Sequence, residues 1–135
     1  MQTVTSAAAP QFSRAGVIWL QLAIVYLIVG VSIGIAMGVT QNFTLRPVHA
    51  HINLLGWTTM ALAGLIYTVF PRAGASRLAR IHFWLMNLAQ PVMLFTLSLV
   101  LFGKTGIEPI LGVSEIMAAA GILTFAANLF LNLKD

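Results

Sequence analysis

The sequence contains no cysteine and very little charge. Without thiols, the chain cannot form a disulfide, a thiolate-bound zinc site, a cysteine-ligated iron–sulfur cluster or the covalent attachment of a c-type haem. Only 7% of its residues are charged, whereas soluble domains carry about 25% charged residues. Because 59% of the residues are hydrophobic and the mean hydropathy is +0.94, the composition excludes an ordinary soluble domain and indicates a protein of the lipid bilayer.

Acidic residues are scarcer than basic ones. The chain has 3 Asp and Glu against 7 Lys and Arg, which gives a formal net charge of +4. Nucleic-acid binding needs a patch or stripe of cations, but these basic residues stand singly beside apolar stretches. We therefore expect no nucleic-acid partner, and we interpret the cations as determinants of membrane topology.

Four windows of the sequence are long and apolar enough to cross a bilayer. A helix needs about 20 mainly apolar residues to span about 30 Å of hydrocarbon, and the windows 16–39, 49–70, 78–102 and 110–133 meet that length. The short segments between them contain Gly, Pro, Asn or Lys, which are typical of helix ends. The sequence thus predicts an all-α membrane protein, with a single four-helix transmembrane domain over 1–135 in contact with membrane lipid.

The distribution of Lys and Arg predicts how these helices are oriented. One side of the arrangement carries Arg14, Arg72, Arg77, Arg80 and Lys134, and the other carries Arg46 and Lys104. Because cytoplasmic segments carry the excess of basic residues, both termini are expected in the cytoplasm. We expect an integral protein of a bacterial or archaeal inner membrane, with the second span starting at the outer face and His82 at the inner boundary.

His49 and His51, at the outer end of the second span, are the most informative polar residues. An ionisable side chain in a membrane is costly unless a partner, a cofactor or water satisfies it, and imidazole commonly ligates haem iron. Residues two apart on an α-helix point about 200° away from each other, so the pair cannot ligate one iron. Either each histidine addresses a different haem or metal, completed by another helix or copy, or both are interfacial histidines satisfied by water and headgroups.

Neighbouring residues extend this candidate site. Arg46 and Lys104 offer cations for haem propionates, although both also suit ordinary topology charges. Trp57 supplies a flat aromatic wall, and Pro47 suits a helix start. Glu115 is expected about 9 Å into the fourth span, where it would accept a proton, bond a ligating imidazole or remain a buried, protonated carboxyl.

Glycines and amides predict helix packing. Gly30, Gly34 and Gly38 recur every four residues in the first span, a pattern that lets two membrane helices approach closely. Asn87 and Gln90 lie in the third span, where amide side chains commonly bond to a neighbouring helix. We expect both amides to bond helix to helix.

The chain carries three motifs in order: 47–56 (PVHAHINLLG), 64–71 (GLIYTVFP) and 79–84 (ARIHFW). They resemble the tenth and eleventh helices of the haem-copper oxidase catalytic subunit, where a His-x-His pair with a glycine five residues on precedes Gly-x-Ile-x-x-x-x-Pro, a short loop and Ile-His-Phe. By this resemblance His49 takes the position of the high-spin haem's ligand and His51 that of the low-spin haem's ligand. Arg46 and His49 also resemble the Arg-x-x-His around the low-spin ligand on another helix of that family, so the two roles stay interchangeable.

The resemblance implies haem, an oligomer and redox chemistry. The family's catalytic subunit has twelve helices in three groups of four, so a homotrimer of this chain would rebuild that layout. Such a protein would bind haem b at His49 and His51, with more than one haem per oligomer. It would transfer electrons or bind oxygen or nitric oxide, with quinol or cytochrome c as electron donor.

Departures from the family's pattern limit the implied activity. Copper in that family needs three further histidines, including an adjacent pair, and often a cross-linked tyrosine. This chain has 3 histidines in all and no adjacent pair, and Tyr26 and Tyr67 lie in no matching motif. Copper and complete oxygen reduction are therefore disfavoured. Four hypotheses remain: a haem b cytochrome, a reduced oxidase or nitric oxide reductase, an assembly or accessory subunit that carries haem or copper to a larger oxidase, and a structural subunit that binds nothing.

Overall fold

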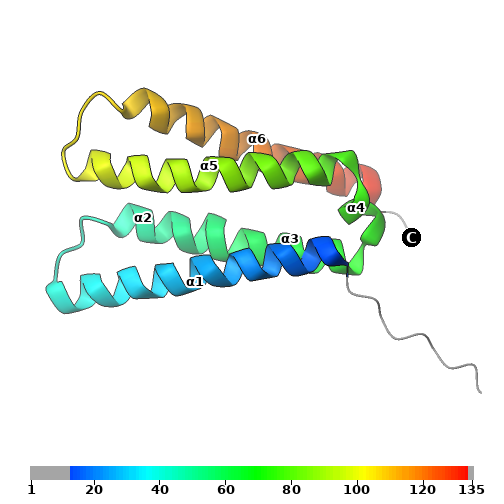
Figure 1. Cartoon of the computed structure of the whole chain (residues 1–135), viewed down its shortest axis with the longest axis horizontal. Coiled ribbons are helices and arrows are strands. Elements are labelled where there is room, and N and C mark those ends of the chain that lie inside the picture. The colour runs from blue at the N-terminus through cyan, green and yellow to red at the C-terminus, as the bar shows by residue number, and fades with distance from the viewer. Residues whose placement is uncertain (1–12, 134–135) are drawn as a thin grey trace, which may run out of the picture.

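A computed structural model describes residues 13–133, and this part of the chain consists of helices joined by short loops, with no strand (Figure 1). The helices are α1 (Arg14–Thr40), α2 (Arg46–His51), η1 (Ile52–Thr59), α3 (Met60–Val69), α4 (Pro71–Ala75), α5 (Arg77–Leu101) and α6 (Glu108–Asn132). Here α2, η1 and α3 form one continuous span. Four helices are therefore long and apolar enough to cross a membrane, as predicted, with ends within three residues of the predicted windows.

The second span contains a π-helical segment, η1, which the sequence did not predict. A π-helix has i→i+5 hydrogen bonds and is rare. In η1, side chains from inside and outside the segment donate hydrogen bonds to its carbonyl oxygens. Thr59 Oγ1 donates to Leu54 O at 2.7 Å, and Gln90 Nε2 on α5 donates to Leu55 O at 2.8 Å. The predicted helix-to-helix bond is thus confirmed for Gln90. It is wrong for Asn87, which donates to Phe83 O within its own helix.

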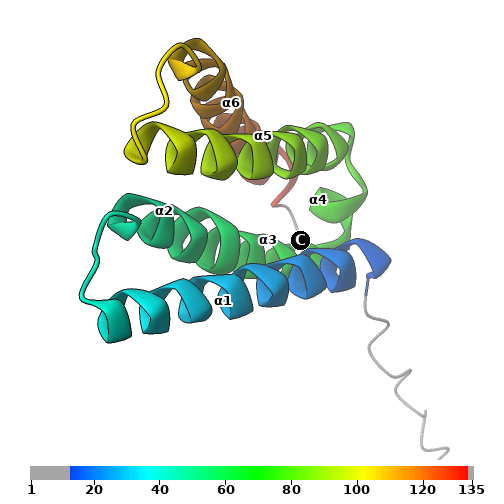
Figure 2. The ribbon, with the colours of Figure 1, turned by 60° about the vertical axis from the view of Figure 1, so that its left-hand side comes forward.

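The helices form two hairpins that are more closely packed within themselves than against each other. In one hairpin α1 packs along η1 and α3, and in the other α5 packs along α6 (Figures 1 and 2). Glycine permits the closest approach in the first hairpin, where a Cβ added to Gly64 would lie 2.9 Å from the carbonyl oxygen of Gly16. The backbones of α1 and α3 therefore meet with no side chain between them.

The larger of two apolar clusters joins the hairpins. Its buried members come from both hairpins and from α4: Trp19, Ala23, Met60, Ala63, Tyr67, Ala73, Ala79 and Met86. Large hydrophobic side chains also cover the outside of the bundle, and Ile116, Leu123 and Phe130 are 72%, 70% and 88% exposed. A surface of this kind is expected where lipid tails, not water, surround the protein.

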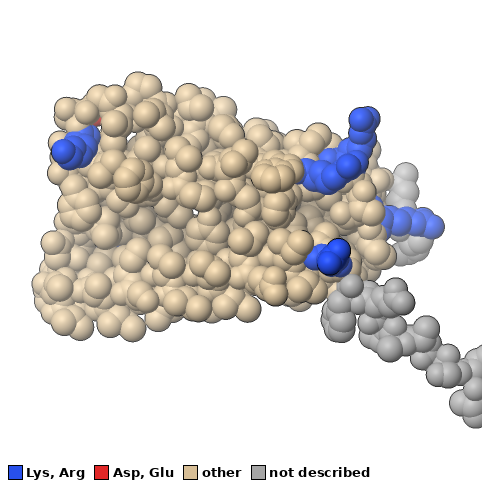
Figure 3. Space-filling model, viewed as in Figure 1, with Lys and Arg blue, Asp and Glu red and all other residues tan. Residues whose placement is uncertain are grey.

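The two ends of the bundle differ in composition. The basic end, defined by Arg14, Arg72, Arg77 and Arg80, comprises the start of α1, α4, the start of α5 and the end of α6. The histidine end, defined by His49 and His51, comprises α2 and the loops 41–45 and 102–107. In the face seen in Figure 3, Lys and Arg gather at the ends and leave an uncharged band between them. Lys134, predicted at the basic end, lies outside the described residues.

Candidate functional site

His49 and His51 lie on different sides of α2. Nδ1 of His49 is 2.9 Å from the carbonyl oxygen of Gly30 on α1, whereas His51 lines a cavity with Met93 of α5 and Glu115 of α6. The sequence prediction that the two rings serve different faces is therefore confirmed. Pro47 stands at the start of α2, as also predicted.

The surroundings of His49 fix which ring nitrogen carries the hydrogen. A carbonyl oxygen only accepts, so Nδ1–H donates to Gly30 O. The Asn53 amide donates to the carbonyl oxygen of His49 at 2.8 Å and lies 3.3 Å from Nδ1, which keeps the ring in place. In the neutral ring, Nε2 is then the nitrogen with a free lone pair.

Gly30, Gly34 and Gly38 form the glycine seam of α1, and the first two of them make room for the side chains of His49 and Asn53. A Cβ added to Gly34 would lie 2.9 Å from His49 Cε1, and one added to Gly30 would lie 2.8 Å from Asn53 Nδ2. A Cβ on Gly38 would meet nothing within 4 Å. The predicted close approach along the glycine seam is thus confirmed at Gly30 and Gly34, between α1 and the second span of the same chain.

His51 has the same hydrogen assignment from a different partner. Its Nδ1 lies 2.8 Å from the carbonyl oxygen of Pro47, one turn earlier in α2, so Nδ1–H donates and Nε2 keeps the lone pair. The cavity beside it measures about 300 Å³ and is bounded by α2, η1, α5 and α6. Its other lining residues are Leu55, Met93, Glu115, Ala118, Ala119 and Ile122.

Glu115 lies at the depth of the histidines, as predicted. It shares the wall of the His51 cavity, although its side chain is exposed and not buried. No hydrogen bond in the described residues joins its carboxylate to either imidazole. A carboxylate and an imidazole thus face one cavity and are not bonded to each other.

Arg46 and Lys104 are exposed at the histidine end. The Arg46 guanidinium lies 5.4 Å from the ring centroid of Phe43, and Lys104 lies in the loop between α5 and α6. Trp57 is partly buried against the apolar cluster around Trp19 and does not line the His51 cavity. Its role as an aromatic wall of a haem site stays a prediction.

No single copy offers a many-ligand metal centre. Among residues 13–133 there is no group of three or more His, Cys, Asp or Glu side chains that could hold a metal ion. The third histidine, His82, lies toward the basic end.

His82 lies near the start of α5, toward the basic end as its sequence position predicts, and its ring is buried among other helices. Its ring is fully covered and lies between Trp19 and Phe125, with ring centroids 4.5 and 4.7 Å away and both interplanar angles 25°. Tyr67 Oη lies 2.9 Å from Nδ1. Rings from α1 and α6 therefore cover both faces of the imidazole.

A chain of hydrogen bonds leads to His82. Asn128 Nδ2 donates to Tyr67 Oη at 3.3 Å, and Tyr67 Oη lies within hydrogen-bond distance of His82 Nδ1. Ser76 Oγ, which caps α5, donates to Asn128 Oδ1 at 2.8 Å. Nε2 of His82 and Oε1 of Gln90 are buried without a partner in the described residues. This network was not predicted from the sequence, although Asn128 and Asn132 late in an apolar span were a signal for it.

Replacing Tyr67 by phenylalanine is expected to destabilise the protein by about 1–3 kcal/mol, because the buried His82 Nδ1 then loses its partner and Asn128 Nδ2 keeps only the carbonyl oxygen of Ala73. Thermal unfolding in detergent, followed by circular dichroism, measures the effect as a melting temperature lower by several degrees. Tyr26→Phe is the matched control, since Tyr26 packs its ring on Gly56 and lies outside the network. Equal melting temperatures for the two variants would contradict the network's role.

No protein-family model, curated protein or solved structure matches this chain.

Proposed function

We propose that this chain is a haem b-binding integral membrane cytochrome, with His49 and His51 as axial ligands near the histidine end. One observation carries the proposal: both histidines donate Nδ1–H to a backbone carbonyl oxygen and so keep Nε2 for a ligand. Ligating histidines almost always have their second nitrogen bonded in this way, because the bond fixes the ring and raises the basicity of the ligating nitrogen.

The separation of the two rings favours more than one haem in an oligomer. His51 Nε2 serves the cavity beside α5 and α6, and His49 serves the side of α1. A second axial ligand would then come from another copy. A homotrimer, the arrangement implied by the resemblance to the haem-copper oxidase catalytic subunit, would bring three histidine pairs to one depth.

Charged and polar groups at the histidine end suit the rest of a haem. Arg46 and Lys104 are exposed there and would pair with propionates. Glu115 would accept a proton or bond a water from the wall of the His51 cavity. Trp57, in the same span, would contribute only indirectly through the apolar cluster.

The chemistry that haem supplies depends on its axial positions. Two protein ligands favour electron transfer from quinol or cytochrome c, whereas an open position admits oxygen or nitric oxide, as in a reduced oxidase or nitric oxide reductase. By the positive-inside rule, the basic end and both termini would face the cytoplasm of a bacterial or archaeal cell. The histidine end would then meet its electron partner at the outer face.

A second candidate function is the delivery of haem or copper to a larger respiratory oxidase. Met93 lines the same cavity as His51, and a thioether beside an imidazole suits Cu(I). Metal analysis separates the two candidates. Stoichiometric iron supports the cytochrome, and loosely held copper supports the delivery subunit.

The cytochrome proposal is tested by a reduced-minus-oxidised spectrum and the iron content of protein purified from haem-replete cells. We expect a Soret band in the wild type and the loss of the corresponding haem in His49→Ala and in His51→Ala. Added imidazole is expected to restore the band in His51→Ala, because the ligand can enter the cavity left by the side chain. A colourless wild type, or a band that neither substitution alters, contradicts the proposal.

A further inference from the structure

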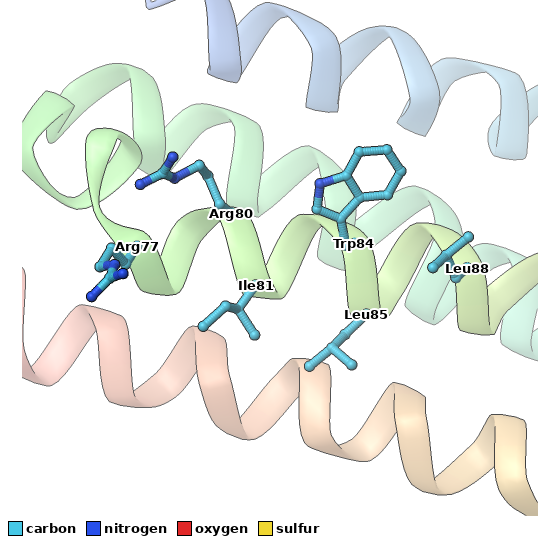
Figure 4. Close-up of a pocket in the computed structure, with 6 residues that line it drawn as sticks. All are labelled: Arg77, Arg80, Ile81, Trp84, Leu85 and Leu88. Atoms are coloured by element: carbon cyan, nitrogen blue, oxygen red, sulfur yellow. The ribbon is translucent and has the colours of Figure 1, made fainter.

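The start of α5 carries an exposed groove at the basic end, remote from the histidines. It measures about 650 Å³ and is lined by Arg77, Arg80, Ile81, Trp84, Leu85 and Leu88 (Figure 4). We propose that this groove is a binding site for one anionic diacyl glycerophospholipid of the adjacent leaflet.

The groove is polar at its mouth and apolar along its floor. Arg77 and Arg80 lie in the first turn of α5, at the membrane boundary, and Leu88 lies about 12 Å deeper at 1.5 Å per residue. In Figure 4, Arg80 and Trp84 point to one side of the helix, while Ile81 points to the other side, toward α6. A headgroup would therefore meet the guanidinium groups while an acyl chain follows the leucines.

The tryptophan sits where lipid-facing indoles are favoured. Trp84 is 61% exposed and lies one turn deeper than Arg80. Indoles gather at the headgroup level of membranes because one part of the ring is apolar and its N–H is polar. Together with the arginines, it forms a boundary between headgroup and hydrocarbon.

Charge complementarity favours a phosphate over a protein partner. Both arginine side chains are exposed, and no ion pair joins either of them to another of residues 13–133. The acidic side chains in those residues are Glu108 and Glu115, both in the first half of α6, near the histidine end. A second copy oriented alike in the membrane would bring neither carboxylate to the arginines. A lipid phosphate lies at their level and suits the two-pronged donor geometry of guanidinium.

A second hollow explains why the ligand should have two chains. It measures about 180 Å³, and its lining includes Ala15, Ile18 and Phe83 in addition to Arg80 and Trp84. Arg80 and Trp84 therefore stand between the two hollows and line both of them. One headgroup at Arg80 would place an acyl chain in each hollow, which a single apolar chain would not do.

Native mass spectrometry of the whole protein, with added dioleoyl phosphatidylglycerol or dioleoyl phosphatidylcholine, tests the site. We expect one retained phosphatidylglycerol per chain and about tenfold weaker retention in Arg80→Gln, because a hydrogen bond to a charged group is lost. Arg14→Gln is the matched control. It removes one exposed cation at the same end, outside the groove, and is expected to bind like the wild type.

Three results would overturn the proposal. Equal retention of the two lipids would show that charge plays no part. Equal weakening by Arg80→Gln and Arg14→Gln would mean that the whole basic end attracts lipid, with no site at α5. A dimer that is lost in Arg80→Gln, with no lipid bound to the wild type, would make the groove a protein contact.

Discussion

Replacement of Gly34 by leucine is expected to abolish haem binding at His49 and to destabilise the bundle by about 1–3 kcal/mol, the usual effect of overpacking. The added Cβ alone would lie 2.9 Å from His49 Cε1, and the remaining atoms of leucine need still more room. The imidazole would have to leave α1, which breaks its bond to Gly30 O and releases Nε2 from its fixed direction. Haem content per chain and the melting temperature measure the two consequences.

Gly38→Leu is the matched control, since it lies one turn along the same helix and its Cβ would meet nothing within 4 Å. It is expected to keep both the haem content and the melting temperature of the wild type. If Gly34→Leu retained full haem, His49 would not be a ligand. If Gly34→Leu melted like Gly38→Leu, the contact between the histidine and the glycine seam would be wrong.

Replacement of Gly64 by leucine is expected to have the largest effect on stability, about 3 kcal/mol or a failure to fold. An added Cβ would lie 2.9 Å from the carbonyl oxygen of Gly16 and 2.9 Å from Leu20 Cγ. A backbone carbonyl within a helix cannot turn aside as the end of a flexible side chain can, so α1 must separate from α3. The yield of monodisperse protein and its melting temperature report the loss.

Gly112→Leu controls for the added hydrophobic volume, because a Cβ at Gly112 on α6 would meet nothing within 4 Å. It is expected to purify and melt like the wild type. A Gly64→Leu protein with the same yield and melting temperature as Gly112→Leu would show that α1 and α3 do not approach as closely as described.

The four spans and the two directions of the histidines were predictable because both depend on local properties. The length of an apolar run decides whether a helix can cross hydrocarbon, and the rotation per residue decides where neighbours on a helix point. The positions of His49, His51 and Glu115 follow from these two rules. The spacing of the glycines in the first span also correctly indicated that α1 and the second span lie close together at Gly34.

The surroundings of His82 and Trp57 were not predictable, because they come from helices far away in the sequence. The rings that stack on His82 belong to α1 and α6, and the cluster that covers Trp57 forms only when the two hairpins meet. The sequence predicted the place of His82 near Arg80, but not the burial of its ring. The π-helical segment was not predicted for the same reason, since Gln90 of another helix donates a hydrogen bond to one of its carbonyl oxygens.

Because of the π-helical segment η1, the number of residues in the second span decides how α2 is rotated about the helix axis relative to α3. Each residue of a regular α-helix turns the chain by about 100°, and η1 accommodates additional residues per turn between the histidines and α3. Deleting one residue from 52–59 would let the segment relax toward regular geometry and would rotate the part before it relative to the part after it. Both imidazoles would then swing away from Gly30 and from the cavity, although every remaining side chain would be unchanged. Insertions and deletions of one or two residues in this segment would therefore change the direction in which the histidine side chains point. Homologous chains with a segment of different length are expected to differ in the surroundings of their histidines.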